Sequence, residues 1–274
     1  SLVRDDEGAV FTGKATQSNW HLVEGYDGHD WYWKDDTSSD ETTGHFYGYP
    51  LYYDLCADDE EKAKVADHAG VLAQYIIDGD YTLIDLDGQP TGWGHWEPAK
   101  VVGALDGLEE CMLTVGDFDT CTMSAYGGGW LNGTEILGHL LAAYHVTGDE
   151  TFFRAYETLI REHRYDEAVD FHDEIYTVTN PAIANHSDHE LAMLAYQSLI
   201  RYEADDTRRQ RWIDSPAAWY QYETAARQPL WAAYVALSGV EGVPIAEAVQ
   251  TLREYPLDLR EWHFDNSHRK DCSE

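Results

Sequence analysis

A helix, a short acidic turn and a second helix recur three times along this sequence, and this repeat constrains the fold more than any other feature. The turns lie at residues 57–60, 147–150 and 204–207, and each follows an apolar helix that contains tyrosine. A helical hairpin cannot bury its apolar faces alone, so repeated hairpins must stack. We therefore expect a mainly α protein with antiparallel helix pairs at about residues 41–77, 131–163 and 187–225.

The segments between these hairpins have weaker patterns. Residues 81–96 alternate in polarity and are interrupted by Asp87-Gly88, which is typical of a β-hairpin. We expect further helices at about 99–113, 165–176 and 244–254, and a bend at Pro50, because proline removes a backbone donor. Residues 1–30 are rich in Gly and Asp and predict an irregular arm with at most one short strand. All 274 residues are expected to form one domain, with the β-hairpin as a small insertion.

The charge of the chain narrows its possible partners. The formal net charge is -33 at pH 7, with 51 acidic and 18 basic side chains spread along the whole length. Such a surface repels nucleic acid and anionic membranes, and no apolar run is long enough to span a bilayer. Spread acidity with little Lys is typical of proteins from salty surroundings, where salt screens the repulsion. The composition does not predict an oligomeric state.

The four cysteines do not have metal-binding spacing. Cys56 follows an apolar helix face, so we expect it to be buried and free. Cys111 and Cys121 either form a disulfide across a short loop, if the protein is exported, or remain free thiols. The sequence starts without a positively charged leader, as expected of a mature or trimmed N-terminus. This slightly favours a secreted or periplasmic location.

Three helix starts carry the spacing of a capping box. Ser38 and Glu41, Asn132 and Glu135, and Ser187 and Glu190 each stand three apart, as this cap requires. Acidic and imidazole side chains surround two of these starts: Asp36, Asp40 and His45 at the first, and His186, Asp188 and His189 at the last. Because the first helices of stacked hairpins point the same way, their N-termini should meet at one rim, where the helix dipoles favour negative charge. We expect these six side chains to surround one pocket, although each box could also be only a cap.

Two segments resemble a known class of proteins. Residues 33–41 (WKDDTSSDE) with Gly44-His45, and residues 185–190 (NHSDHE) with residues 201–203, are similar to bacterial carbohydrate-active proteins of the (α/α) toroid, or six-hairpin glycosidase-like, class. Residues 265–269 (DNSHR) also fit, so the resemblance extends over about residues 31–270. It implies an (α/α) toroid fold and a role on carbohydrate. Fewer than six hairpins are visible, so the ring is either incomplete at its C-terminal end or completed by residues 97–130.

Hydrolysis of a glycosidic bond requires two carboxyl groups, one as acid and one as base or nucleophile. The first and last helix starts could supply one each, so we assign Asp36, Asp40, Asp188 and His189 as candidate catalytic residues. The carboxylates of the two segments should then lie within about 15 Å of each other. Candidate substrate-binding residues, with rings to stack on sugars or polar groups to hold hydroxyls, are Trp33, His45, Tyr47, His95, Trp96, Trp130, His186 and Glu190. Each Trp could instead be a packing residue.

Other functions fit the same residues. His186, Asp188 and His189, with His45 or Asp40, would suit a divalent metal ion, and otherwise no cofactor is expected. Lyase chemistry would use His or Tyr to remove a proton next to a uronate carboxylate. It also requires an Arg or a metal, and Arg is scarce near this rim. A non-catalytic carbohydrate-binding toroid would keep the aromatic residues without close carboxylates. The sequence does not identify the sugar or the linkage.

Overall fold

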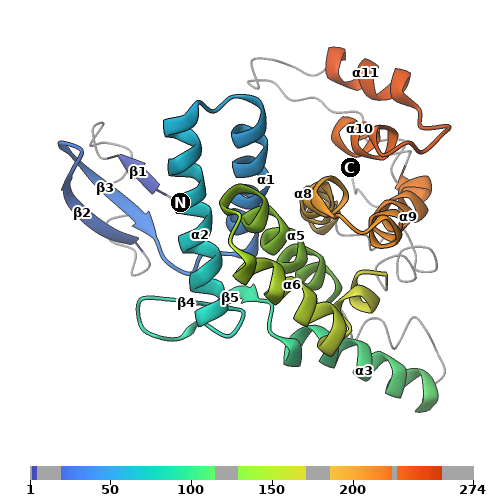
Figure 1. Ribbon diagram of the computed structural model, residues 1–274, viewed down its shortest axis with the longest axis horizontal. Helices are drawn as coiled ribbons and strands as arrows, with labels where there is room; N and C mark the ends of the chain where they lie inside the picture. The colour runs from blue at the N-terminus through green and yellow to red at the C-terminus, as the bar shows by residue number, and fades with distance from the viewer. Residues whose placement is uncertain (1, 5–19, 115–128, 171–185, 224–226, 255–274) are drawn as a thin grey trace, which may run out of the picture.

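The computed structural model describes residues 2–4, 20–114, 129–170, 186–223 and 227–254. This part of the chain is mainly helical, as the sequence predicts, and carries two small antiparallel sheets (Figure 1). No helix in these ranges is both long and apolar enough to cross a lipid bilayer.

The three predicted helical hairpins are present. They pair α1 (Ser39–Leu55) with α2 (Asp59–Asp78), α5 (Gly129–Thr147) with α6 (Glu150–His163), and α8 (His186–Tyr202) with α9 (Asp206–Glu223). An acidic residue in each turn caps the helix that follows. The carboxylates of Asp58, Asp149 and Asp205 each accept a hydrogen bond from a backbone N–H group of the next helix at 2.8–3.0 Å. These bonds satisfy donors that the first turn of a helix leaves unpaired, which explains why the turns are acidic.

Helices α1 and α5 run in the same direction, although they belong to different hairpins. The ring of His139 in α5 stacks on Phe46 in α1, with 4.7 Å between centroids. Further along both helices, the Asp54 carboxylate of α1 accepts a hydrogen bond from His145 Nε2 of α5 at 2.7 Å. The contacts advance in the same order along both chains, so the N-termini of the two helices lie at the same end.

Helix α8 is parallel to the same two helices. A Cβ atom on Gly138 of α5 would lie only 2.9 Å from the carbonyl oxygen of Ala195 in α8, so glycine is needed for the close approach of the two backbones. Towards the C-terminal ends, Tyr202 of α8 stacks on His145 with 3.9 Å between centroids and donates to Asp54 at 3.0 Å. The N-terminal ends of α1, α5 and α8 therefore lie together, as stacked hairpins predict.

Helix α5 forms the centre of the described structure. It contacts α1, α2, α3, α6 and α8, and nearly all of its residues are buried. Its apolar positions include Ile136, Leu137, Leu140 and Leu141, which are almost fully buried. A helix that is apolar on every side belongs in a core, so the few polar residues of α5 are the ones that require an explanation.

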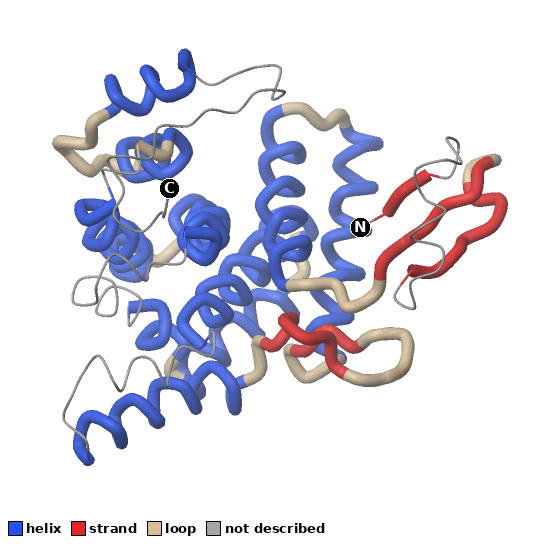
Figure 2. The backbone as a smooth tube through the Cα atoms, turned by 180° about the vertical axis from the view of Figure 1, so that it is seen from behind, coloured by secondary structure: helices blue, strands red, loops and turns tan. Residues whose placement is uncertain are grey.

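Two antiparallel sheets lie near the α1–α2 hairpin (Figure 2). One contains β1 (Leu2–Arg4), β3 (His29–Lys34) and β2 (Trp20–Tyr26) in that order, and the other pairs β4 (Thr82–Ile84) with β5 (Pro90–His95). The predicted β-hairpin at Asp87-Gly88 is confirmed. The predicted irregular arm is wrong for residues 20–30, which form β2, the turn after it and the start of β3. Asp27 and Gly28 between them both have positive φ, 53° and 74°, as a tight hairpin turn requires.

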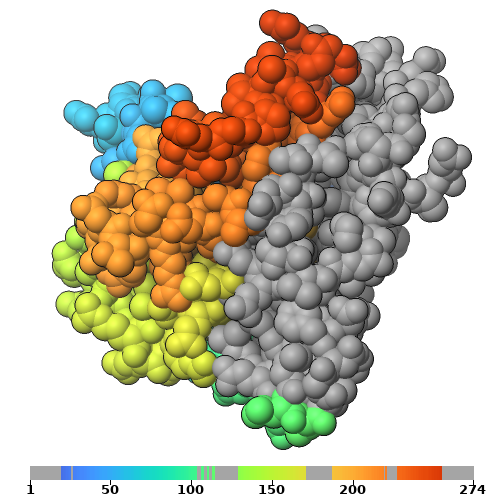
Figure 3. Space-filling model, turned by 90° about the vertical axis from the view of Figure 1, so that its right-hand side faces the viewer, coloured from blue at the N-terminus to red at the C-terminus, as the bar shows by residue number. Residues whose placement is uncertain are grey.

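The remaining helices are α3 (Pro98–Thr114), α10 (Pro229–Leu237) and α11 (Ile245–Glu254), and residues 165–170 are also helical. Helices α9, α10 and α11 form much of the described surface in Figure 3. Pro50 is buried inside α1, which continues beyond it. The prediction for Cys56 is half correct, because the thiol is free but exposed at the end of α1. Cys121 and Cys272 lie outside the described residues, so the pairing of Cys111 with Cys121 stays a prediction.

Candidate functional site

A buried polar cluster lies where α1 and α5 meet the segment after β5. Glu135 and His139 stand one turn apart on α5, and both are almost inaccessible to solvent (0% and 1% exposed). Trp96 donates from Nε1 to Glu135 Oε2 at 2.9 Å, and the Thr43 hydroxyl lies 3.0 Å from His139 Nε2. The Phe46 ring closes the cluster by stacking on His139. The core of the molecule thus contains a carboxyl and an imidazole in hydrogen-bonding surroundings.

Burial controls the protonation of both groups. It raises the pKa of Glu135 to about 8, although the nearby Trp96 and Thr43 side chains lower it. Burial also lowers the pKa of His139 to about 3, so at neutral pH the carboxyl is protonated and the imidazole is uncharged. Glu135 Oε1 and His139 Nδ1 are buried and have no hydrogen-bond partner among the described residues.

Two further carboxylates act on Glu135 from neighbouring helices. Asp40 lies in the first turn of α1 and Asp188 in the first turn of α8, and the charges of both raise the pKa of Glu135. Asp40 is exposed and Asp188 is partly exposed. Carboxylates from the first turns of α1 and α8 therefore act on Glu135 of α5.

The predicted capping box at Ser187 and Glu190 is wrong. Helix α8 already includes His186 and Ser187, and the Glu190 carboxylate faces α10. It accepts hydrogen bonds from Trp231 Nε1 and Gln228 Nε2, both at 2.6 Å. Burial raises the pKa of Glu190, and these two donors lower it. Glu190 thus links α8 to α10 by hydrogen bonds and does not cap the N-terminus of α8.

His189 is buried, and its ring meets that of Trp231 edge-on at 5.7 Å between centroids. It is therefore a packing residue of the α8–α10 contact in this structure. The side chain of His186 lies outside the described residues. Its predicted role in substrate or metal binding stays a prediction.

The predicted capping box at Asn132 and Glu135 is also wrong, because α5 begins at Gly129 and includes both residues. The Asn132 side chain donates instead to the carbonyl oxygen of His95. The capping box at Ser38 is confirmed: Glu41 accepts from the Ser38 backbone N–H at 3.0 Å and from its hydroxyl at 2.9 Å. Only one of the three proposed boxes forms, because the other two helices begin earlier than their polar residues suggest.

Two of the predicted sugar-stacking residues are core residues. Trp96 and Trp130 are buried (0% and 4% exposed), so neither ring can serve as an open platform. His95 is partly exposed, and its Nδ1 lies 3.3 Å from Glu97. Tyr47 packs edge-on against Tyr234 of α10, with 6.3 Å between centroids.

Asp36 connects the start of α1 to the β4–β5 hairpin. Its carboxylate accepts the backbone N–H of Gly92 at 2.7 Å, and its own N–H donates to Asp85 at 2.8 Å. The residue is exposed and has a positive φ of 52°, which suits Asp in a tight turn. These contacts give the Asp36 carboxylate a structural function.

Trp33 and His45 lie in a different place from the buried cluster. Both line a cavity of about 620 Å³ between β3, α1, α2 and the β4–β5 hairpin. Glu41 and Thr42 of α1 also line it, whereas Asp40 and Asp188 are not among its described lining residues. The residues predicted to form a single pocket are thus divided between this cavity and the N-terminal end of α1 and α8.

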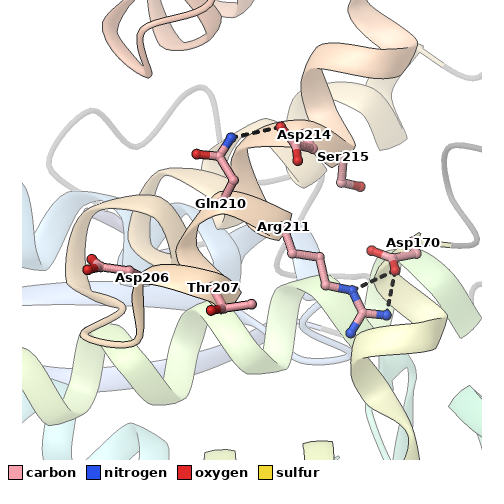
Figure 4. Close-up of a pocket in the computed structure, with 7 residues that line it drawn as sticks. All are labelled: Asp170, Asp206, Thr207, Gln210, Arg211, Asp214 and Ser215. Atoms are coloured by element: carbon pink, nitrogen blue, oxygen red, sulfur yellow. Dashed lines mark hydrogen bonds and ion pairs between the residues drawn. The ribbon is translucent and has the colours of Figure 1, made fainter.

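A second hollow lies beside α9, and none of the predicted site residues line it (Figure 4). Arg211 extends across it and pairs with Asp170 through its Nε at 2.6 Å, and also with Asp166. Its charged groups thus partly neutralise one another. In the described ranges, no group of three His, Cys, Asp or Glu side chains is close enough to hold a metal ion.

The geometry defines a class of candidate site: a buried, protonated carboxyl in the core, with two further acidic residues in the first turns of neighbouring helices. Comparisons of this chain with protein-family models, with curated proteins and with solved structures find no match. The function of the site must therefore be inferred from its own chemistry. Sequence reasoning missed the importance of Glu135 and His139. The signal was an ionisable pair inside a helix that is otherwise almost entirely apolar.

Proposed function

We propose that this protein is a carbohydrate-active hydrolase that cleaves a glycosidic bond in an oligo- or polysaccharide, with Asp40 and Asp188 as the carboxyl pair. The observation that carries the proposal is that both residues raise the pKa of the same buried acid, Glu135. Glycoside hydrolysis requires two carboxyl groups on either side of the scissile bond. Asp40 and Asp188 are at least partly exposed, so a substrate could reach them.

The position of the pair supports the proposal. Asp40 and Asp188 lie in the first turns of α1 and α8, and the positive end of a helix stabilises negative charge, as a base or nucleophile requires. Glu135 is buried and does not meet the substrate, so we assign it as a positioning residue beneath the pair.

We further propose that the three described hairpins belong to an (α/α) toroid, as in six-hairpin glycosidase-like proteins. Helices α1, α5 and α8 would be its inner helices, and α2, α6 and α9 its outer ones. The parallel direction of the first three supports this arrangement, because the inner helices of stacked hairpins share one direction. A crystal structure in which α1, α5 and α8 do not line one ring would contradict it.

The function can be tested with Asp40→Asn and Asp188→Asn. Each change removes one ionisable group and keeps the shape of the side chain, so each variant should lose activity by about 100-fold or more. The assay measures reducing ends released from a panel of oligosaccharides, with and without a chelator. Asp59→Asn is the matched control, because Asp59 is also an acidic residue in the first turn of a helix.

Three results would contradict the proposal. The first is that the wild-type protein cleaves no oligosaccharide of the panel. The second is that Asp40→Asn and Asp188→Asn both retain the activity of Asp59→Asn. The third is that the chelator abolishes hydrolysis, which would favour a metal-dependent reaction instead of one performed by paired carboxyl groups alone.

A further inference from the structure

The described lining of the cavity beside β3 and α1 includes aromatic rings and one lysine, but not Asp40 or Asp188. Its volume of about 620 Å³ lies in the range of roughly 300–1,000 Å³ that is typical of small-molecule sites. Four rings contribute to its walls: Trp33 of β3, His45 and Tyr49 of α1, and Tyr75 of α2. The His45 and Tyr49 rings stack on each other at 5.4 Å between centroids.

The two carboxylates that line the cavity already have partners. Glu41 accepts two hydrogen bonds from Ser38, in the capping box of α1. Asp85 accepts the backbone N–H groups of Asp36 and Leu86, both at 2.8 Å. Both acids are therefore held by the protein itself, and their negative charge is partly offset by these donors.

Lys34 also lines the cavity, and unlike the two acids it is not held by other described residues. Among the described residues, no ion pair or hydrogen bond of the Lys34 side chain is present. The two acidic residues that follow it are used elsewhere: Asp35 lies 2.7 Å from His21 Nε2, and Asp36 binds Gly92. In contrast, Lys64 on α2 pairs with Glu60 at 2.7 Å.

The sequence has only six lysines and a net charge of -33. Lys100 also has no side-chain partner among the described residues, but it does not line this cavity. A lysine in the lining of a ring-lined cavity, without a protein partner, is available to a negatively charged group of a ligand. The rings next to it favour a flat or cyclic body on that ligand.

We propose that this cavity binds a small cyclic ligand that carries a carboxylate, with the ring against Trp33 and Tyr49 and the carboxylate at Lys34. A sugar acid and an aromatic acid share this chemistry. The proposal concerns binding alone and does not depend on the hydrolase proposal, because Asp40 and Asp188 are outside the described lining of the cavity.

Isothermal titration calorimetry with three probes tests it: D-glucuronate, D-glucose and benzoate, all at one salt concentration that keeps the protein folded. Glucuronate or benzoate should bind at least tenfold more tightly than glucose, since a hydrogen bond to a charged group is stronger than one between neutral groups. Lys34→Met should remove this preference and leave glucose binding unchanged, and Lys34→Arg should keep it. Lys64→Met is the matched control and should behave like the wild type.

Each outcome either supports or overturns the proposal. Tight binding of benzoate that depends on Lys34 identifies an aromatic acid, and tighter binding of glucuronate than of benzoate identifies a sugar acid. Equal affinity for glucose and both acids overturns it, as does an unchanged preference in Lys34→Met or the absence of binding by all three probes. Circular dichroism melting curves show whether the variants are folded. If Lys34→Met does not fold, Lys34→Arg still tests the proposal, because it should keep the preference for the acids.

Discussion

Replacing Glu135 by Gln should stabilise the protein at alkaline pH, although the residue lies in the centre of the core. In an unfolded chain this carboxyl has a pKa of 4.5, and burial raises it to about 8 in the folded state. Between these values the unfolded chain has lost a proton that the folded chain retains. The free energy of unfolding of the wild-type protein must therefore fall as pH rises through this range.

The magnitude follows from the two pKa values. Each pH unit between them corresponds to about 1.4 kcal/mol, so the destabilisation grows by about 3–4 kcal/mol between pH 5 and pH 8. Glutamine resembles the protonated acid in shape and in its ability to accept from Trp96, but it cannot ionise. Glu135→Gln should match the wild-type stability at about pH 5, within about 1 kcal/mol, and exceed it by about 3–4 kcal/mol at pH 8.

Urea unfolding of both proteins, followed by circular dichroism at several pH values and constant salt, measures this difference. His139 adds the opposite slope below pH 6.5, because its pKa is lowered to about 3, but this contribution is common to both proteins and cancels. Glu241→Gln, which removes an exposed carboxyl, controls for the loss of one negative charge. Parallel curves of unfolding free energy against pH for wild type and Glu135→Gln would refute the reasoning.

Three further predictions concern the fold. Asp54→Asn should lower the free energy of unfolding, measured with urea at neutral pH, by about 1–3 kcal/mol. Burial raises the pKa of Asp54, but donors from α5 and α8 hold it below its usual range. The loss of stability should therefore disappear as the pH falls through the pKa of Asp54 in the folded protein. Gly138→Ala should destabilise the folded protein by about 1–3 kcal/mol, since the new Cβ would meet the Ala195 backbone. Gly103→Ala in α3 is the control: the new Cβ has open space, so the stability should stay the same or increase. The melting temperature should rise with salt, because the net charge of -33 is screened; equal melting temperatures at low and high salt would contradict this.

The helical hairpins could be predicted because their signals are local. An acidic residue that caps a helix and an apolar face repeating every three to four positions act within one turn. The β2–β3 hairpin carried an equally local signal, since Asp27-Gly28 is the same dipeptide as Asp87-Gly88. The high Gly and Asp content of the first 30 residues conceals this turn signal.

The candidate site could be predicted only in part, because burial is a property of the whole fold. The spacing of Asn132 and Glu135 fits a capping box, yet the helix begins at Gly129 and surrounds Glu135 with core residues. Trp96 and Trp130 likewise could not be assigned to the core from their own neighbours. The largely apolar character of residues 130–146 is the clue, since such a helix is central and its ionisable residues are in unusual surroundings.

Parallel packing of α1, α5 and α8 places like ends of three helix dipoles together, which is unfavourable unless charges compensate them. At the C-terminal ends the compensation comes from Arg201 in the last turn of α8, which lies 3.2 Å from Asp54. At the opposite end the compensating charges are carboxylates, in the first turns of α1 and α8. A chain this poor in bases thus places one where these helices end, and has acids where they begin. Glu135 lies more than one turn inside α5, where burial raises its pKa to about 8 and keeps it protonated at neutral pH.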